Sequence, residues 1–193
     1  RRRHTRSFHV TGVQTCALPI FRVNGAAQDF DSPREALDAG IATVYQDLAT
    51  VPLMSVWRNF FLGNEVTKGV GPFRRLDVKE MKRVSKQELL NMGIDLRDTD
   101  QPIGTLSGGE RQAVAIARAV HFGAKVLILD EPTSALDRSV QLDVLTLLKD
   151  IQEKNDLAYI FISHDLAVVK SISHEVLVMR HGKVVERGLA KDI

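Results

Sequence analysis

Residues 106–137 have the sequence LSGGERQAVAIARAVHFGAKVLILDEPTSALD, in which helix, turn and strand signals follow one another closely. It predicts a helix, a glycine-containing turn, a buried strand and a tight polar loop. Ser107 followed three residues later by Glu110 is a capping box, and apolar residues then recur at helical spacing, so a helix should begin at Ser107. Gly108 and Gly109 keep side chains away from the free backbone N–H groups of the first turn. The positive helix end can then meet a phosphate oxygen, which predicts an anion site.

The strand that follows should end in two carboxylates. Residues 126–129, VLIL, form an uninterrupted apolar run, which suits a parallel strand covered on both faces. Asp130 and Glu131 stand at its carboxyl end, where they could bind a metal ion and a water. A second buried strand is expected at residues 158–162, and it leads to His164. Ligands of open parallel sheets collect at the carboxyl ends of strands, so these residues should share one crevice.

Four segments occur in the order found in one known family. LSGGERQ, the apolar strand ending LDE, SALD and ISHD resemble the signature motif, Walker B motif, D-loop and switch histidine of ATP-binding-cassette (ABC) ATPases. One such motif alone is weak, but four in the family's order are specific, and the resemblance covers most of the chain. It implies an α/β fold: a P-loop NTPase (RecA-like) parallel-sheet core with an ABC-type helical subdomain.

The resemblance also implies roles for single residues. Asp130 would bind Mg²⁺, directly or through water, and Glu131 would orient and deprotonate the attacking water. His164 would contact the γ-phosphate. The other implied ATP contacts and the interface residue lie in the signature motif and the D-loop: Ser107, Gly108, Gly109, Glu110 and Asp137.

A further strand is predicted at residues 41–45, IATVY, and it ends at Gln46. In the resembled family this strand leads into the Q-loop, whose glutamine reaches the magnesium ion and the attacking water. A solvated strand-end residue is the alternative for an isolated glutamine, but the context VYQDLATVPLMSVWRNFFLGNE favours the Q-loop. The preceding helix should be capped by Ser32, with Pro33 at its first position, and closed by Gly40.

Residues of about 47–118 are expected to form the helical subdomain. A helix should run from a cap at Asp77 to Gly93. Trp57 and the phenylalanines that follow it are either ordinary core or an exposed groove for a partner's coupling helix, and the sequence leaves both open. Further along, an amphipathic helix is expected at about 139–153 and a hairpin at 175–186.

Composition fits one soluble domain. The chain has 193 residues, 44% of them hydrophobic, which is enough for one substantial core. No apolar stretch approaches the roughly 20 residues of a membrane helix, so any membrane role would be peripheral. The resemblance to ABC ATPases implies that the chain would lie at the cytoplasmic face of the inner membrane. The single cysteine, Cys16, excludes an intramolecular disulfide framework. The net charge is only +2, and much of the basic excess lies in the first six residues, so a nucleic-acid partner is not supported.

Residues 1–20 are interpreted separately from residues 21–193, which we expect to form an ABC ATPase domain fragment. The segment VTGVQTCALPI resembles the translation of a sequencing-library adapter, which indicates a non-native leader. A disordered basic tail is the alternative. A signal peptide is disfavoured because polar residues and a glycine break the apolar run.

The 193 residues contain no GxxxxGK string followed by Ser or Thr, the phosphate loop of P-loop ATPases. We therefore expect this chain to be the C-terminal part of a cassette that lacks its first strand and phosphate loop. Such a chain should not hydrolyse ATP by itself. In the family two cassettes pair head to tail, and each ATP lies between one partner's phosphate loop and the other's signature motif. The expected cofactors are ATP and Mg²⁺, and the expected partners are a second ABC ATPase domain and transmembrane permease subunits.

The transported substrate is less clearly indicated. Residues of about 31–129 resemble carbohydrate importers, whereas the sequence from Ser134 onward resembles oligopeptide importers. The change falls in DEPTSALD, which both groups share, so the chain is either a chimera or an intermediate family member. The predicted function is ATP hydrolysis for an ABC importer. One alternative is a non-transport ABC ATPase, but the DNA-repair type is disfavoured because the segment before Ser107 is compact. The other alternative is a non-catalytic fragment.

Overall fold

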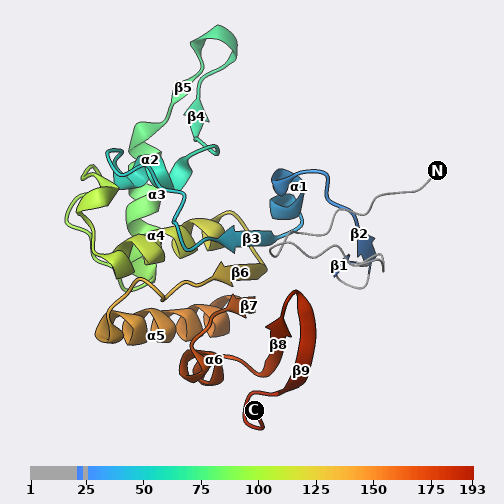
Figure 1. Ribbon diagram of the computed structural model, residues 1–193. Coiled ribbons are helices and arrows are strands. Elements are labelled where there is room, and N and C mark those ends of the chain that lie inside the picture. Colours follow the sequence, from blue (N-terminus) through green and yellow to red (C-terminus); the bar gives the residue numbers. More distant parts are fainter. Residues whose placement is uncertain (1–20, 24–25) are drawn as a thin grey trace.

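The computed structural model describes residues 21–23 and 26–193, so the prediction for residues 1–20 lies outside it. Its centre is a sheet of three parallel strands in the order β3-β6-β7 (Figure 1). These strands are β3 (Ile41–Val44), β6 (Val126–Asp130) and β7 (Ala158–Ile162). Helices connect them, as parallel strands require. The α/β prediction with a parallel sheet is confirmed.

The register of this sheet aligns the carboxyl ends of all three strands. Val44 lies opposite Leu129, and Asp130 lies opposite Ile162. Residues that immediately follow β3, β6 and β7 therefore emerge at one edge. This edge positions the candidate site.

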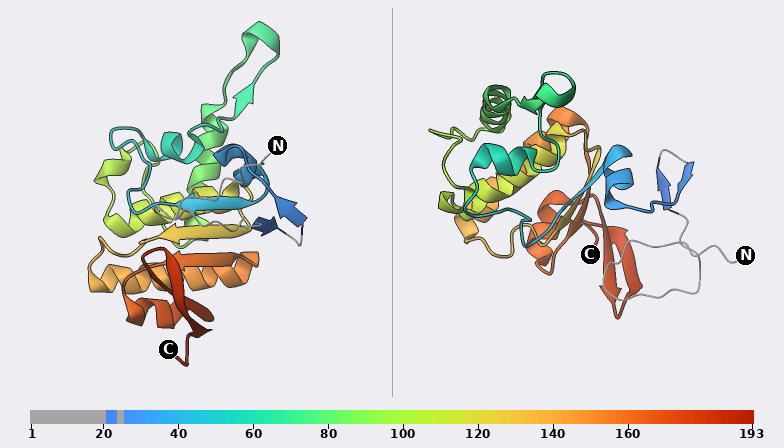
Figure 2. Two further views of the ribbon diagram at one scale, coloured as in Figure 1. Left: turned by 45° about the vertical axis from the view of Figure 1, so that its right-hand side comes forward. Right: turned by 90° about the horizontal axis from the view of Figure 1, so that it is seen from above.

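Helices cover one face of the sheet, as the view from above in Figure 2 shows. On that face Leu127 and Leu129 are fully buried, and they pack with α4 (Gly108–His121) and α5 (Arg138–Asn155). The Tyr159 hydroxyl donates to the Leu148 carbonyl of α5 at 2.8 Å, which ties β7 to the same layer. The other face is different, since Ile160 is 49% exposed there.

The predictions that β6 is covered on both faces and that β7 is a buried strand are therefore wrong in part. In β6, buried residues alternate with half-buried ones, and in β7 every residue is exposed or half-buried. An apolar run shows that a strand could be buried on both faces, but this happens only when a layer of structure packs on each face of the sheet. Among the described residues, β7 is an edge strand and only one helical layer packs fully on the sheet.

A second core joins α2 (Val56–Phe61), α3 (Val78–Asn91) and one face of α4. Trp57 is 5% exposed, and Phe60 and Phe61 are buried completely. These aromatic residues are thus core, which decides between the two interpretations of the apolar stripe. Helix α4 belongs to both cores, because Val114 and Ala117 pack here whereas Ile116 and Ala119 pack on the sheet.

The remaining elements lie around these two cores. The predicted α1 (Pro33–Asp38) is capped by the Ser32 hydroxyl, and α6 (Leu166–Ile172) precedes the predicted hairpin of β8 (Glu175–Arg180) and β9 (Lys183–Leu189). Short pieces complete the chain: β1 (Phe21–Val23), β2 (Ala26–Gln28), β4 (Thr67–Lys68), η1 (Gly71–Phe73), β5 (Arg75–Leu76) and η2 (Ile103–Thr105). The β4–β5 hairpin was not predicted. Within the described ranges, none of the helices has the length and apolar character needed to span a bilayer.

Candidate functional site

Four predicted site residues lie at the carboxyl edge of the sheet. Gln46 is exposed and follows β3 by two residues, Asp130 is the half-buried last residue of β6, and Glu131 comes directly after it. His164 follows the end of β7 by two residues. The aligned register brings them to one edge, as the sequence predicts.

Glu131 is held in a strained position. Its φ of 47° lies in the left-handed region, which is uncommon for a residue other than glycine and is often found at functional sites. Its backbone N–H donates to the Ile162 carbonyl at 3.0 Å, and its own carbonyl accepts from the Ser134 hydroxyl at 2.9 Å. The backbone is therefore fixed from two sides. This conformation turns the carboxylate toward the end of β7.

The Glu131 carboxylate meets His164 there. Glu131 Oε1 lies 2.8 Å from His164 Nδ1. The hydrogen bond to Glu131, and then the charge of that carboxylate, raise the pKa of His164 above its ordinary value of 6.5. Glu131 Oε2 is buried, and within the described part of the chain it has no hydrogen-bond partner. Among the described residues this oxygen therefore leaves a hydrogen-bond acceptor unused, directly beside the end of β6.

The predicted helix start at Ser107 is confirmed. The Ser107 hydroxyl accepts from the Glu110 backbone N–H at 3.2 Å, and Glu110 Oε2 accepts from the Ser107 N–H at 2.7 Å. The capping box is thus complete and fixes the first turn of α4. Ser107 itself is exposed. This turn presents the positive end of a 14-residue helix to solvent.

The two glycines of this turn have a second role that the sequence did not indicate. A Cβ added at Gly108 would lie 2.7 Å from Leu136 Cδ2, and one at Gly109 would lie 2.6 Å from Val140 Cγ1. Both distances are too short for real Cβ contacts, so the glycines let α4 approach the loop before α5 closely. Leu136 and Val140 are residues that sequence reasoning missed, because nothing local marks a contact between separate helices.

Asp137 lies between these two contact residues and caps α5. Its Oδ1 accepts from the Val140 N–H at 3.1 Å and from the Ser139 hydroxyl at 2.8 Å. The Val140 backbone hydrogen bond, followed by the Ser139 hydroxyl, lowers the pKa of Asp137. The carboxylate is exposed and ionised, so it can still contact a partner.

The predicted residues thus form two groups. The strand-edge group contains Gln46, Asp130, Glu131 and His164, and the helix-start group contains the signature residues and Asp137. Mg²⁺ typically binds one or two carboxylates and keeps water and phosphate oxygens as its other ligands. The half-buried carboxylate of Asp130, with the exposed Gln46 just after the neighbouring strand β3, fits that kind of site. Among the residues that the structure describes, three or more His, Cys, Asp or Glu side chains do not gather into a metal-binding cluster.

Comparison with known families decides the classification. The family described as ABC transporter matches residues 21–134. The chain belongs to the ABC transporter family. Gln46, residues 107–110, Asp130 and Glu131 lie within the matched segment, whereas Asp137 and His164 follow it.

Relatives of this ABC ATPase include import proteins for different solutes. The fructose import ATP-binding protein FrcA of Rhizobium meliloti is 40% identical over 178 residues, which covers 90% of this chain and 68% of FrcA. The peptidoglycan transport ATP-binding protein YejF of Agrobacterium fabrum is 42% identical over 154 residues, covering 79% of this chain and 28% of YejF. The chain thus spans about two thirds of the first relative and about a quarter of the second.

Solved structures of ABC cassettes share the fold. The cbiO1 protein of Clostridium perfringens, part of the ABC transporter complex cbiONQ, superposes with a TM-score of 0.69 at 28% identity and covers 88% of this chain and 65% of cbiO1. A dimeric cassette, MJ0796 bound to ADP and Pi, has a TM-score of 0.68 at 22% identity, covering 87% of this chain and 72% of MJ0796. The second likeness shows the fold alone.

Proposed function

We propose that this chain supplies the ATP-hydrolysing residues of an ABC importer. The observation that carries the proposal is the 2.8 Å contact between Glu131 Oε1 and His164 Nδ1 at the strand edge, directly after Asp130. It joins a candidate base to a group that can hold it in place. The family membership supports the same function.

In this proposal Glu131 orients the attacking water and takes its proton, while His164 positions the carboxylate and reaches the γ-phosphate. Asp130, together with the Gln46 amide oxygen, would hold Mg²⁺, which neutralises charge on the phosphates. Ser107, Gly108, Gly109 and Glu110 would face the ATP of a partner domain. Asp137 would lie at the interface between the two domains.

The proposed partners are a second ABC ATPase domain, arranged head to tail, and transmembrane permease subunits at the cytoplasmic face of the inner membrane. In this arrangement the helix-start group of one copy would face the strand-edge group of the other. The proposed solute is a carbohydrate or an oligopeptide. The name of FrcA, a fructose import protein, supports the carbohydrate, whereas YejF is named for peptidoglycan transport. We also propose that the sequence is a chimera joined within DEPTSALD, which long DNA reads spanning that segment would test. One uninterrupted molecule containing both halves would refute the chimera.

The function is tested by Glu131→Gln. Because the 193 residues contain no GxxxxGK(S/T) string, residues 21–193 are joined to the phosphate-loop segment of FrcA for the assay. Loss of a general base typically lowers the rate by about 10² to 10⁴, so turnover should fall by that factor while ATP binding is retained. The matched control is the exposed Glu153→Gln on α5, which should hydrolyse ATP at the parent rate. Equal turnover in the two variants would contradict the proposal.

A further inference from the structure

The β4–β5 hairpin projects from the helical part of the molecule, beyond α2 and α3 (Figures 1 and 2). Its strands are short, and Lys68 of β4 pairs with Arg75 of β5. Two large apolar side chains stand at its tip, since Val70 is 87% exposed and Phe73 is 83% exposed. Single exposed apolar residues are common, but two at the end of a projection are unusual.

The tip is held in one shape. Gly69 has a φ of 95°, and a Cβ there would lie only 2.5 Å from the Phe73 carbonyl oxygen. The Phe73 N–H donates to the Val70 carbonyl at 3.3 Å, and the Arg74 N–H donates to the Gly71 carbonyl at 3.2 Å. The turn therefore presents Val70 and Phe73 outward on a defined backbone.

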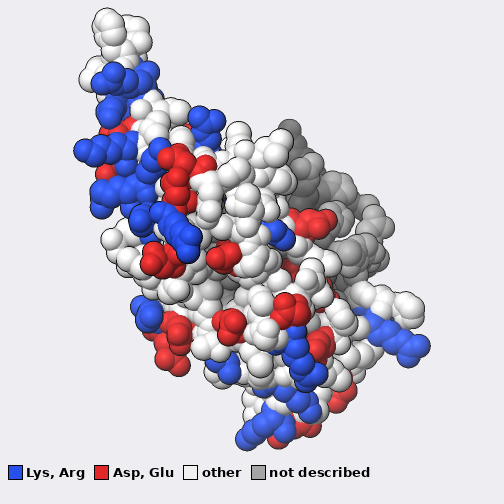
Figure 3. All heavy atoms as spheres, turned by 90° about the vertical axis from the view of Figure 1, so that its left-hand side faces the viewer, with Lys and Arg blue, Asp and Glu red and all other residues white. Residues whose placement is uncertain are grey.

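Cations surround the base of this tip. The Lys68 ammonium pairs with Asp77 at 2.9 Å, whereas Arg74 Nε donates to a neutral partner, Thr67 Oγ1, at 2.7 Å. Within the described ranges, no carboxylate lies in ion-pair distance of Arg74, Arg75 or Lys79. In Figure 3 the projecting end of the molecule is uncharged at its extremity and densely basic below it.

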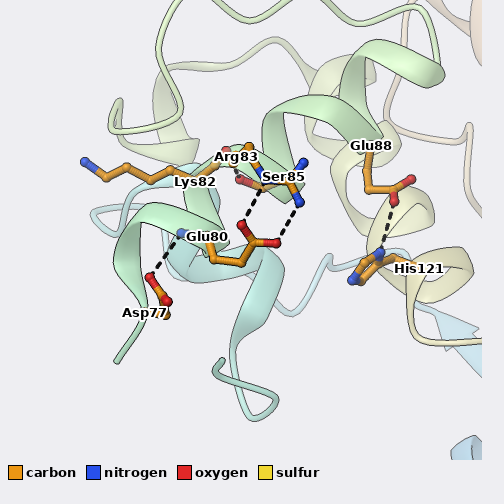
Figure 4. A network of polar contacts seen from close by, with 7 residues as sticks. All are labelled: Asp77, Glu80, Lys82, Arg83, Ser85, Glu88 and His121. Carbon is orange, nitrogen blue, oxygen red and sulfur yellow. Dashed lines mark hydrogen bonds and ion pairs between the residues drawn. The ribbon is translucent and has the colours of Figure 1, made fainter. Parts of the chain in front are cut away.

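The cations further along α3 are engaged differently. Arg83 makes two hydrogen bonds to Glu80, at 2.8 and 2.6 Å, and Glu88 contacts His121 of α4 (Figure 4). Lys82 extends away from this group in Figure 4 and pairs with Asp100. The hairpin and the first turn of α3 thus carry three cations, Arg74, Arg75 and Lys79, that have no ion-pair partner among the described residues.

We propose that the β4–β5 hairpin docks on an anionic lipid surface. Val70 and Phe73 enter the interface between headgroups and acyl chains, while Arg74 and Arg75 lie at the level of the lipid phosphates. Apolar side chains bordered by Lys and Arg match the order of layers in an anionic bilayer. An acidic protein surface would match the cations but would leave the two apolar side chains without an apolar partner. This docking does not depend on ATP hydrolysis, so it stands or falls separately from the proposed function.

The first test measures co-sedimentation of the full chain with vesicles of phosphatidylcholine and phosphatidylglycerol, against vesicles of phosphatidylcholine alone. Each cation near an anionic surface changes partitioning about fivefold, so Arg74→Gln with Arg75→Gln should weaken binding about 25-fold. The control, Lys149→Gln with Lys154→Gln, removes two exposed cations from α5 and should bind like the parent chain. All three proteins carry the same residues 1–20, so any difference reports on the hairpin.

The second test asks whether the tip enters the lipid. Phe73→Trp should shift its emission to the blue on vesicles containing phosphatidylglycerol and be quenched by brominated acyl chains, whereas the native Trp57 is buried and provides a constant background. Leu142→Trp, at an exposed site on α5, should show neither effect. Equal binding by the hairpin and α5 charge variants would overturn the proposal, and so would an unshifted emission from the Phe73→Trp variant. Retention on immobilised polyglutamate without vesicle binding would also overturn it and assign the hairpin to an acidic protein.

Discussion

At the scale of single residues, the Glu131–His164 pair couples the candidate base to a titrating group. His164 is 78% exposed on its side chain, whereas Glu131 is 21% exposed, so the histidine can exchange protons with solvent while it holds the carboxylate. The protonation state of His164 therefore determines how firmly Glu131 is held in the ATP-free chain. The contact with Glu131 moves the titration of His164 to higher pH.

We predict that His164 titrates above pH 6.5 and that Glu131→Gln moves its midpoint down. The folded pKa is raised above the unfolded value of 6.5, so the contribution of this pair to stability is fully present below pH 6.5. It is lost as the pH rises through the raised folded pKa. The measurement is the NMR shift of the His164 Cε1 proton against pH, with His174 as a control outside the contact. A His164 midpoint that is the same in both proteins would exclude the coupling.

Two substitutions at Ser107 can distinguish its role as a helix cap from its proposed role as a phosphate contact. Ser107→Ala removes the cap and should destabilise the folded chain by about 1 kcal/mol. Ser107→Asp keeps a good cap, so thermal stability should remain near that of the parent, but its charge should repel a phosphate and abolish ATPase activity in the joined protein. Unfolding temperature and ATPase rate are measured on both variants. Normal activity of Ser107→Asp would leave the motif as a structural cap only.

At the scale of elements, the start of α4 packs on the start of α5 through glycine. Gly109→Ala places a methyl group 2.6 Å from Val140 Cγ1, and Val140 cannot swing aside because its side chain is short and β-branched. Overpacking costs about 1–3 kcal/mol, and the better helix propensity of alanine offsets about 1 kcal/mol of that. We therefore expect a net destabilisation of up to about 2 kcal/mol by urea unfolding.

Gly108→Ala provides the matched comparison for this prediction. It meets the flexible end of Leu136, so its effect should be smaller. Val140→Ala combined with Gly109→Ala should restore part of the lost stability, which a double-mutant cycle would report as a favourable coupling. Additive effects in that cycle would show that the two helices are not coupled through this contact.

The elements also show where prediction from sequence succeeds and where it fails. The Ser107–Glu110 box could be predicted because both partners lie within one helical turn. The Gly109–Val140 contact could not, since it depends on how two helices pack. The β4–β5 hairpin was missed because each strand has only two residues and its apolar residues face outward rather than alternating. The left-handed Glu131 has no local signal either, because the φ of 47° is fixed by hydrogen bonds to Ile162 and Ser134.

At the scale of the whole molecule, β7 is an apolar edge strand of the sheet that residues 26–193 form, and within that range one of its faces is incompletely covered. Unpaired edges with exposed apolar side chains promote association between chains. Ile160→Lys should therefore reduce self-association of the chain, because it places a charge where Ile160 is 49% exposed. Light scattering against protein concentration measures the effect. The control is Leu142→Lys, also at an exposed apolar site but on a helix, and an equal reduction by that variant would show that association does not involve the β7 edge.

The membership of α4 in both cores has a consequence for motion. A helix clamped along two faces moves as a rigid rod, because bending it would open one packed layer or the other. Any tilt of α2 and α3 must then move α4 with them and change the direction in which the N-terminal end of α4, at Ser107, points. In the proposed function, where the turn at Ser107 contacts a partner domain's ATP, a displacement imposed far from this turn would move it toward or away from the phosphate without refolding any loop.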